Sequence, residues 1–509
     1  MSPTAPRHIE ARAMQPFMAH PFDSDRLHEE CGIFGAIGVV DASNFVALGL
    51  HALQHRGQEA GGIVAHHPDF GFNSAHRFGY VRDNFTKPEL MATLPGQLAI
   101  GHVRYSTAGT KANTAIRDVQ PFFGEFHMGG CAIAHNGNIT NAAALRRELI
   151  ERGSIFQSSS DSECIIHLMA RSIQRNIPER MKDALRRVEG AFSVIAMTRT
   201  KLIGVRDALG VRPLVLGKVG EDGYVLASET CALDIIGAEF LREVEPGEMV
   251  VISKGQIESS RPFGPSTGRF CIFEHVYFSR PDSIIGGRSV YETRRQIGVE
   301  LAREAPVEAD LVCPVPDSGT PAAIGYAQES GIPYGMGIIR NQYMGRTFIE
   351  PTDQIRNMGV RLKLNVNRAL IRGKRVVLVD DSVVRGTTSR KIKDMIIDAG
   401  AAEVHFRIAS PPTAWPCFYG VDTPDRDKLL AANMSPEQMR EWIGVDSLSF
   451  VSLDGLYRAA GEAAGRDPQA PRYCDACFSG DYPVAPFDQL ERGFRMKVGS
   501  ETAVKQAAE

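Results

Sequence analysis

Two adjacent carboxylates, Asp380 and Asp381, are the side chains whose placement most clearly indicates chemistry. They end a run of aliphatic residues over 376–379, which is typical of a buried strand in a parallel sheet. The loop 385–388, Arg-Gly-Thr-Thr, follows, and 389–397 has the apolar spacing of a helix. Such a loop can close its backbone N–H groups around a phosphate at the helix N-terminus. Because paired carboxylates suit a sugar diol or a hydrated Mg²⁺, the stretch predicts a phosphosugar site; an ordinary strand and helix with a solvated acidic turn is the alternative.

A second stretch repeats this order, with a predicted short strand at 310–315, then Asp317-Ser-Gly-Thr320, then a helix. The stretch 374–388 resembles the phosphoribosyl pyrophosphate (PRPP) motif of type I phosphoribosyltransferases, and it is not a Walker loop. The resemblance implies that the 5′-phosphate is held by Arg385, Gly386, Thr387 and Thr388. It implies that the pyrophosphate faces Asp317, Ser318, Gly319 and Thr320. It assigns the magnesium site to Ser318, Asp380 and Asp381.

Residues 340–352 are polar, interrupted by a glycine and ended by Pro351-Thr352, which predicts a loop. The segment resembles the mobile loop of the phosphoribosyltransferases, and the resemblance implies that Arg346 binds PRPP. A lid would exclude water while the bond from C1 to pyrophosphate breaks, and magnesium and arginine would offset the charge on the leaving group. A plain exposed loop is the commoner meaning of this composition.

Cys31 stands directly before an apolar strand with spaced glycines, a position that a buried structural cysteine takes more often than a nucleophile. Four polar blocks follow it in the order 55–62, 101–109, 135–138 and 160–163. The ordered set resembles the class II glutamine amidotransferases, which are N-terminal nucleophile (Ntn) hydrolases with a four-layer α-β-β-α fold. The resemblance implies that residues 1–30 are a propeptide, and that their removal frees the α-amine of Cys31 to take the proton of its thiol.

The same resemblance gives individual residues of these blocks a role in binding glutamine. Arg104 pairs with the α-carboxylate through its planar guanidinium, and Asp161 holds the α-ammonium. The side chain of Asn136 and the N–H of Gly137 form the oxyanion hole, and Thr107 lines the same pocket. Taken alone, Asn136-Gly137 is also a hairpin-turn sequence, and Arg104 suits a surface ion pair. The prediction of a glutamine site therefore rests on all the blocks together.

Four of the nine cysteines form a further group of possible ligands, Cys271, Cys417, Cys474 and Cys477. The last two make a C-x-x-C, which outside secreted proteins indicates metal or redox chemistry. Judged from the spacing alone, a bound metal and no metal are about equally expected, with zinc ahead of iron as the metal. The sequences around all four resemble the iron–sulfur branch of the glutamine PRPP amidotransferases, which implies a structural [4Fe–4S] cluster. Core positions are predicted for Cys131, Cys164, Cys231 and Cys313.

The composition of the 509-residue chain, with 43% hydrophobic residues, 23% charged residues and a net charge of −3, is that of a globular protein. It gives no reason to expect nucleic acid or a membrane as a partner. No apolar run approaches the length of about 18 residues that a membrane span needs. The leader lacks the apolar centre of a secretory signal, and nine cysteines in such a chain indicate a reducing compartment, so a cytoplasmic location is predicted.

The elements that must position these groups are predicted to form two domains of mixed α/β and α+β class. Residues 31–255 are expected to form the Ntn hydrolase domain, and the Ser-, Pro- and Gly-rich residues 253–269 a linker. Residues 270–465 are expected to form a type I phosphoribosyltransferase domain with a parallel sheet, including an amphipathic helix over 291–305. Residues 466–509 are the C-terminal segment with the C-x-x-C and a polar tail.

The resemblance covers about residues 31–483 and implies a glutamine-dependent glycosyltransferase of the pentosyltransferase kind. Ammonia released through a thioester at Cys31 would displace pyrophosphate from PRPP, giving 5-phosphoribosylamine and glutamate, in the first committed step of purine (IMP) synthesis. The resemblance also implies Mg²⁺, a [4Fe–4S] cluster, a tetramer or dimer of identical chains, and feedback inhibition by purine nucleotides.

Three alternatives are an amidotransferase with another acceptor such as a hexose phosphate, a PRPP-sensing regulator, and a phosphoribosyltransferase fused to an inert domain. The Arg-Gly-Thr-Thr loop argues against the first, since a sugar isomerase domain has no need of it. The second is disfavoured because a sensor has no use for Cys31, Arg104, Asn136 and Asp161. The third can be tested by removing the Cys31 thiol, because an inert first domain would make glutamine-dependent synthesis independent of Cys31.

Overall fold

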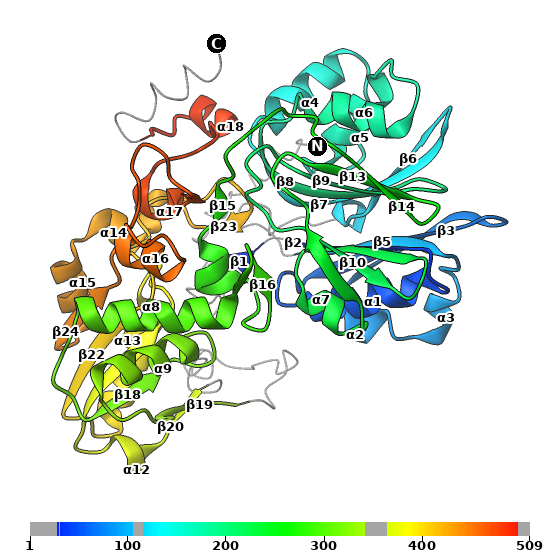
Figure 1. Ribbon diagram of the computed structural model, residues 1–509. Coiled ribbons are helices and arrows are strands. Elements are labelled where there is room, and N and C mark those ends of the chain that lie inside the picture. The colour runs from blue at the N-terminus through cyan, green and yellow to red at the C-terminus, as the bar shows by residue number, and fades with distance from the viewer. Residues whose placement is uncertain (1–27, 30, 105–115, 342–363, 497–509) are drawn as a thin grey trace, which may run out of the picture.

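The computed structural model describes residues 28–29, 31–104, 116–341 and 364–496. Most of the predicted propeptide (1–27 and 30), Thr107 and Arg346 therefore lie outside the described residues. Figure 1 shows two packed sheets with helices on both outer faces, and beside them a domain built on a smaller sheet.

The first sheet is antiparallel and contains the strand that begins with Cys31. Its strands are, in spatial order, β12 (Glu239–Glu243), β10 (Val215–Val219), β11 (Gly223–Ala227), β2 (Cys31–Ile37), β5 (Leu98–Arg104), β3 (Ala60–His67) and β4 (Gly71–Phe78). Its outer face carries α1 (Ala42–Ala52), α2 (Val81–Asn84), α3 (Pro88–Met91) and α7 (Cys231–Asp234). Strand β2 is apolar on both faces because Phe34 packs with α1 while Ile33 points into the layer between the sheets.

The second sheet packs on the first and is also antiparallel. Its order is β14 (Gln256–Ser260), β13 (Met249–Ser253), β9 (Leu202–Arg206), β8 (Gly190–Met197), β7 (Gly129–Ile139) and β6 (Phe122–Phe126). Helices α4 (Ala142–Glu151), α5 (Glu163–Arg171) and α6 (Ile177–Leu185) cover it (Figure 1). The predicted four-layer α-β-β-α fold is confirmed. Strand β14 continues this domain past residue 255, so the beginning predicted for the linker is too early: its polar residues pair along β13.

The second domain has a parallel sheet with the order β18 (Leu311–Pro314), β21 (Arg375–Asp380), β22 (Glu403–Ile408) and β24 (Ser447–Phe450). One face carries α8 (Val290–Glu304), α9 (Thr320–Ser330) and α16 (Leu453–Ala459), and the other carries α13 (Thr387–Asp398) and α15 (Pro436–Ile443). The central residues 376–379 of β21 are all apolar because Val377 and Val379 face one helix layer while Val376 and Leu378 face the other. The helix predicted over 291–305 is confirmed as α8, and so is the parallel sheet.

Short elements complete the described chain. Between the domains lie β15 (Phe270–Cys271), the π-helical turn η2 (Glu274–Phe278), β16 (Ile284–Ile285) and β17 (Arg288–Ser289). Others are η1 (Ile116–Asp118), β19 (Ile338–Arg340), β20 (Leu364–Val366), α12 (Arg368–Ile371), η3 (Arg426–Lys428), α14 (Leu430–Asn433), β25 (Tyr473–Cys474), α17 (Ala476–Ser479) and α18 (Phe487–Glu491). Strand β1 (His28–Glu29), just before Cys31, pairs with β23 (Val421–Asp422) of the second half of the chain. None of the helices in the described ranges is long and apolar enough to cross a membrane.

Candidate active sites

Cys31 and Arg104 lie opposite each other on neighbouring strands, β2 and β5. Residues paired in this way point to the same face of a sheet, so the predicted nucleophile and the predicted carboxylate-binding side chain are neighbours. Cys31 is buried, and Arg104 is partly exposed while its Nη1 donates to Asp118 O at 3.0 Å. This contact uses one of the guanidinium N–H groups and ties the side chain to the segment that follows residue 115.

Asn136 and Gly137 lie on β7, which contacts β2 from the facing sheet. The side chain of Asn136 is completely buried, yet neither its Nδ2 nor its Oδ1 has a hydrogen-bond partner among the residues that the structure describes. Because a buried amide without partners is costly, such a group is typical of a site that a ligand completes. Gly137 has a φ of 137°, and a Cβ there would collide with Ala191 O, so only glycine fits.

Asp161 is fixed beside the same strand, because its Oδ2 accepts from Ile139 N at 2.9 Å and its Oδ1 from Ser162 Oγ at 3.1 Å. It lines a cavity of about 290 Å³ together with Asn138 and Arg146. The C-terminal segment closes the other side of this cavity with Asp488 and Arg492, which the sequence did not associate with glutamine. Asp488 Oδ2 accepts from Ala143 N at 2.7 Å and so caps the N-terminus of α4.

The sequence analysis gave no role to His135 and Ser162, two polar residues that lie next to Asn136 and Asp161 in the sequence. The Nδ1 of His135 lies 2.8 Å from Ser162 Oγ, and its backbone N–H donates to Gln120 Oε1 at 2.8 Å. Burial lowers the pKa of His135, so the ring is neutral and acts as a hydrogen-bonding spacer. The signal for this group was present in the sequence, since His135 and Ser162 belong to the same polar blocks as Asn136 and Asp161.

The two loops predicted to bind PRPP follow β18 and β21, which are adjacent parallel strands. They therefore meet at one edge of the sheet, where open α/β sheets bind ligands. The contact is close, because a Cβ on Gly319 would collide with Val379 O. Ser318 Oγ is buried without a hydrogen-bond partner in the described part of the chain, whereas Asp317 is exposed and pairs with Arg340 at 2.5 Å.

The acidic pair is buried at the end of β21, with Asp380 3% and Asp381 1% exposed. Ser382 Oγ donates to Asp381 Oδ1 at 2.6 Å, and the Oδ2 of Asp381 has no hydrogen-bond partner within the described ranges. After the pair, Gly386 has a φ of 75° and leads into α13, whose first residues are Thr387 and Thr388. The predicted order of strand, acidic pair, loop and helix is therefore the observed one.

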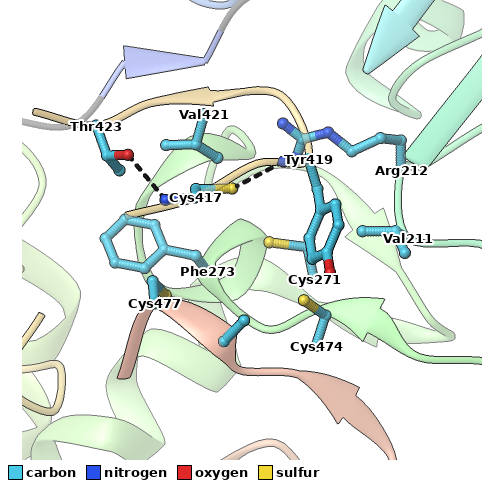
Figure 2. A pocket seen from close by; sticks show the side chains of 11 residues that line it. Val211, Arg212, Cys271, Phe273, Cys417, Tyr419, Val421, Thr423, Cys474 and Cys477 are labelled. Atoms are coloured by element: carbon cyan, nitrogen blue, oxygen red, sulfur yellow. Dashed lines mark hydrogen bonds between the residues drawn. The ribbon is translucent and has the colours of Figure 1, made fainter. Parts of the chain in front are cut away.

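Cys271, Cys417, Cys474 and Cys477 line a single cavity at the junction of the domains, and Figure 2 shows their sulfur atoms around one space. Cys271 and Cys474 are paired residues of the parallel strands β15 and β25. Burial, with smaller contributions from the neighbouring thiols, raises the pKa values of Cys474 and Cys477 well above the usual range, and burial raises that of Cys271 to about 12. In the described residues no three His, Cys, Asp or Glu side chains lie close enough to hold one metal ion. The four cysteines that were predicted to be core residues, Cys131, Cys164, Cys231 and Cys313, are buried.

Three features occur together in this chain: a thiol beside an arginine, a buried amide that has no hydrogen-bond partner within the described ranges, and two phosphate-type loops on a parallel sheet. They are the features of a glutamine amidotransferase coupled to a phosphoribosyltransferase. A family model described as a glutamine amidotransferase domain matches residues 107–234. The amidophosphoribosyltransferase of Rhizobium etli is 56% identical over 476 residues, which cover 92% of this chain and 95% of that protein. That of Bacillus subtilis is 48% identical over 461 residues, with coverage of 90% and 95%.

The solved structure of the B. subtilis glutamine PRPP amidotransferase, complexed with ADP and GMP, matches with a TM-score of 0.84 and 46% identity, covering 90% of this chain and 98% of that one. A structure described as the allosteric regulatory enzyme of purine biosynthesis matches equally, with a TM-score of 0.84 and 46% identity. The chain belongs to the amidophosphoribosyltransferase family. The predicted enzyme class and activity, glutamine-dependent formation of phosphoribosylamine in purine synthesis, are confirmed by this membership.

Proposed function

We propose that this chain carries out the family's reaction with Cys31 as nucleophile of the first half-reaction. The thiol passes its proton to the free α-amine of Cys31, and the sulfur attacks the amide carbon of glutamine. The tetrahedral oxyanion is bound by the Asn136 side chain and the Gly137 N–H. Collapse to the thioester returns the proton to the departing ammonia, and water then releases glutamate. The observation that carries this proposal is the completely buried amide of Asn136, which has no hydrogen-bond partner in the described part of the chain and lies on the strand that contacts β2.

Arg104 and Asp161 would hold the α-carboxylate and α-ammonium of glutamine, with Thr107 as a further pocket residue. The opposite charges of the two side chains support this division, as does the fixing of Asp161 beside β7 by Ile139 N. Removal of residues 1–30 is part of the proposal, because an amide nitrogen at Cys31 could not accept the thiol proton. An uncleaved chain should therefore be inactive towards glutamine.

In the second half-reaction we propose that ammonia displaces pyrophosphate from C1 of PRPP. The loop over Asp317, Ser318, Gly319 and Thr320 would bind the pyrophosphate, with Arg346 closing over it. The 5′-phosphate would lie on Arg385, Gly386, Thr387 and Thr388, at the N-terminus of α13. Asp380 and Asp381 would then face the ribose between these two loops.

Magnesium fits this site on two observations. Ser318 Oγ and Asp381 Oδ2 are buried oxygens without hydrogen-bond partners among the described residues, and oxygen is the donor that Mg²⁺ prefers. Ser318, Asp380 and Asp381 would hold the ion, largely through water and substrate oxygens. When bound, the ion would offset the charge that develops on the pyrophosphate.

A [4Fe–4S] cluster is the cofactor that we propose for the cysteine-lined cavity. The donor set fits, because Cys271, Cys417, Cys474 and Cys477 are the thiols of one cavity and cluster irons take thiolates. A cluster binds its thiolates on four separate irons, so they stand farther apart than the ligands of a single ion would. The cluster would join the C-terminal segment to both domains, and its role would be structural.

The B. subtilis relative was solved with ADP and GMP, and we propose that purine nucleotides also inhibit this chain. A homo-oligomer, dimeric or tetrameric, and a cytoplasmic location complete the proposal, and the odd cysteine count supports the reducing compartment.

The deciding experiment measures glutamate and pyrophosphate from the purified protein with and without PRPP and magnesium. We expect equal amounts of both products, strong dependence of glutamate release on PRPP, and complete loss of glutamate release in Cys31→Ala. Cys131→Ala, a buried cysteine of the same domain, is the matched control and should keep the activity. Pyrophosphate that never appears would refute the second half-reaction, and glutamate release that survives Cys31→Ala would refute the first.

A further inference from the structure

The turn between β9 and β10 carries a fully buried arginine, Arg212, that the proposed chemistry does not use. Its guanidinium reaches in two directions. Nη1 lies 3.2 Å from Glu274 Oε1, in the π-helical turn between the domains, and Nη2 donates to Gly420 O in the segment before β23. Figure 2 shows Arg212 beside Tyr419 at the edge of the cysteine cavity. One side chain of the first domain thus holds two segments of the second half of the chain.

Gly420 in turn lies directly on the proposed oxyanion hole. A Cβ on Gly420 would lie 2.9 Å from Gly137 Cα and 3.1 Å from Gly137 C, so the two backbones are in contact. A second contact beside it fixes the same segment, because Asn138 Nδ2 donates to Phe418 O at 2.9 Å. The strand that carries Asn136 and Gly137 is therefore braced from outside its own sheet by residues about 280 positions away.

Arg212 is held in place by a continuous series of buried ion pairs. Glu274 also binds Arg56 Nη2 through Oε2 at 2.7 Å, and Arg56 pairs with Glu229 through its Nε. Arg212 and these three side chains are all completely buried. Burial alone would raise the pKa of Glu229, but Arg56 and His55 overcome that effect and hold it below the ordinary value, so the carboxylate stays ionised. Separating the partners of a buried ion pair would leave a charge without compensation and is therefore costly. These side chains thus keep their positions.

The backbone of Arg212 is tied to the oxyanion strand as well. Ser193 Oγ donates to Arg212 O at 3.1 Å, and Ser193 is the residue of β8 that pairs with Asn136 on β7. Arg212 is therefore linked to the proposed oxyanion hole by two routes, through Ser193 to Asn136 and through Gly420 to Gly137.

We propose that Arg212 is a positioning residue for glutamine hydrolysis: held by Glu274, it presses Gly420 against Gly137 and so fixes the N–H that receives the oxyanion. The proposal rests on the oxyanion role proposed above for Asn136 and Gly137. It makes the hole a product of both halves of the chain, since residues 137 and 420 meet only when the second domain is docked. Displacement of a catalytic group by about 1 Å can lower a rate on the order of 100-fold, so a small shift of Gly420 is sufficient.

The test compares Arg212→Lys with Arg206→Lys. Lysine keeps the charge beside Glu274 but cannot reach Glu274 and Gly420 O together. Arg206, the last residue of β9, is the matched control, because it is also buried and its guanidinium donates to Val244 O and Gly210 O, each at 2.6 Å, rather than to Gly420 O. We expect Arg212→Lys to lower kcat for glutamine hydrolysis about 10-fold or more, with an unchanged KM for glutamine, and Arg206→Lys to stay near the parent.

Two further measurements separate positioning from general damage. The first is pyrophosphate release with an ammonium salt as the nitrogen donor, which needs no oxyanion hole. The second is alkylation of Cys31 by iodoacetamide, followed by mass spectrometry, because displacement at a saturated carbon forms no oxyanion. Both rates should be unchanged in Arg212→Lys. A parallel fall in either rate, or an unchanged kcat for glutamine, would overturn the proposal.

Gly420→Ala keeps every charge and provides a second route if Arg212→Lys does not fold. Its new Cβ presses on Gly137, so it should show the same selective loss of kcat; an unchanged kcat would refute the brace. Asn136→Ala separates the inference from its foundation. If that variant keeps its kcat, the oxyanion assignment fails and the brace fails with it. If it loses kcat while Arg212→Lys and Gly420→Ala do not, only the inference is wrong.

Discussion

His102 gives the protein a sensitivity to acid whose size can be worked out from the structure. It lies in β5, opposite Ile33 of β2, and is completely buried. Burial, followed by the nearby charges of Arg104 and His135, lowers its pKa from 6.5 to about 3. In the unfolded chain the ring takes up a proton as the pH falls below 6.5, whereas the folded chain resists this until about pH 3. Stability is therefore complete above the unfolded pKa and is lost as the pH falls through this window.

The magnitude follows from the two pKa values. Between pH 7 and pH 5 the proton uptake of the unfolded state is worth about 1.9 kcal/mol of unfolding free energy at this one residue. His102→Leu removes the titrating ring and leaves an apolar side chain of similar size in the layer between the sheets. The variant should therefore lose about 1.9 kcal/mol less stability than the parent between the two pH values.

Urea unfolding followed by pulse proteolysis measures this difference at both pH values and one ionic strength. Other titrating groups contribute equally to parent and variant, so the comparison isolates His102. His127→Leu is the control for loss of a histidine as such, since His127 is exposed in the turn between β6 and β7. The reasoning would be refuted if His102→Leu and the parent lost the same stability on acidification.

Three further perturbations test the packing and the second site. Glu229→Gln should lower the unfolding free energy by about 3–5 kcal/mol, because it removes one of the two buried carboxylates that pair with Arg56 and leaves Glu274 shared between Arg56 and Arg212. Urea midpoints measure this, and a near-neutral effect would contradict it. Gly298→Ala should destabilise the α8–α9 contact by about 1–3 kcal/mol, since its methyl would collide with Ala322 O; an unchanged midpoint would show that the helices can separate freely. Asp381→Asn should abolish magnesium-dependent pyrophosphate release while alkylation of Cys31 continues at the parental rate, and release at the parental rate would remove Asp381 from the proposed site.

The sequence by itself determined those features whose physical cause lies within a few residues. The strand, acidic pair, loop and helix of 376–398 could be predicted because the apolar run, the carboxylates and the helical spacing follow each other along the chain. The same holds for Cys31 at the start of its strand and for the polar blocks, whose order along the chain identified the fold. Helix α8 was predicted within one residue at each end from its apolar spacing.

The tertiary structure alone decided which distant charges neutralise one another and which backbone segments touch. Arg56, Glu229 and Glu274 carry no local signal of complete burial, because a charged side chain is normally exposed and its partner here is about 170 to 220 positions away. The contact of Gly420 with Gly137 and the closing of the Asp161 cavity by Asp488 are likewise set by docking of the two halves. The strand β14 was missed for a related reason: its polar residues form a strand only because β13 offers a free edge to pair with.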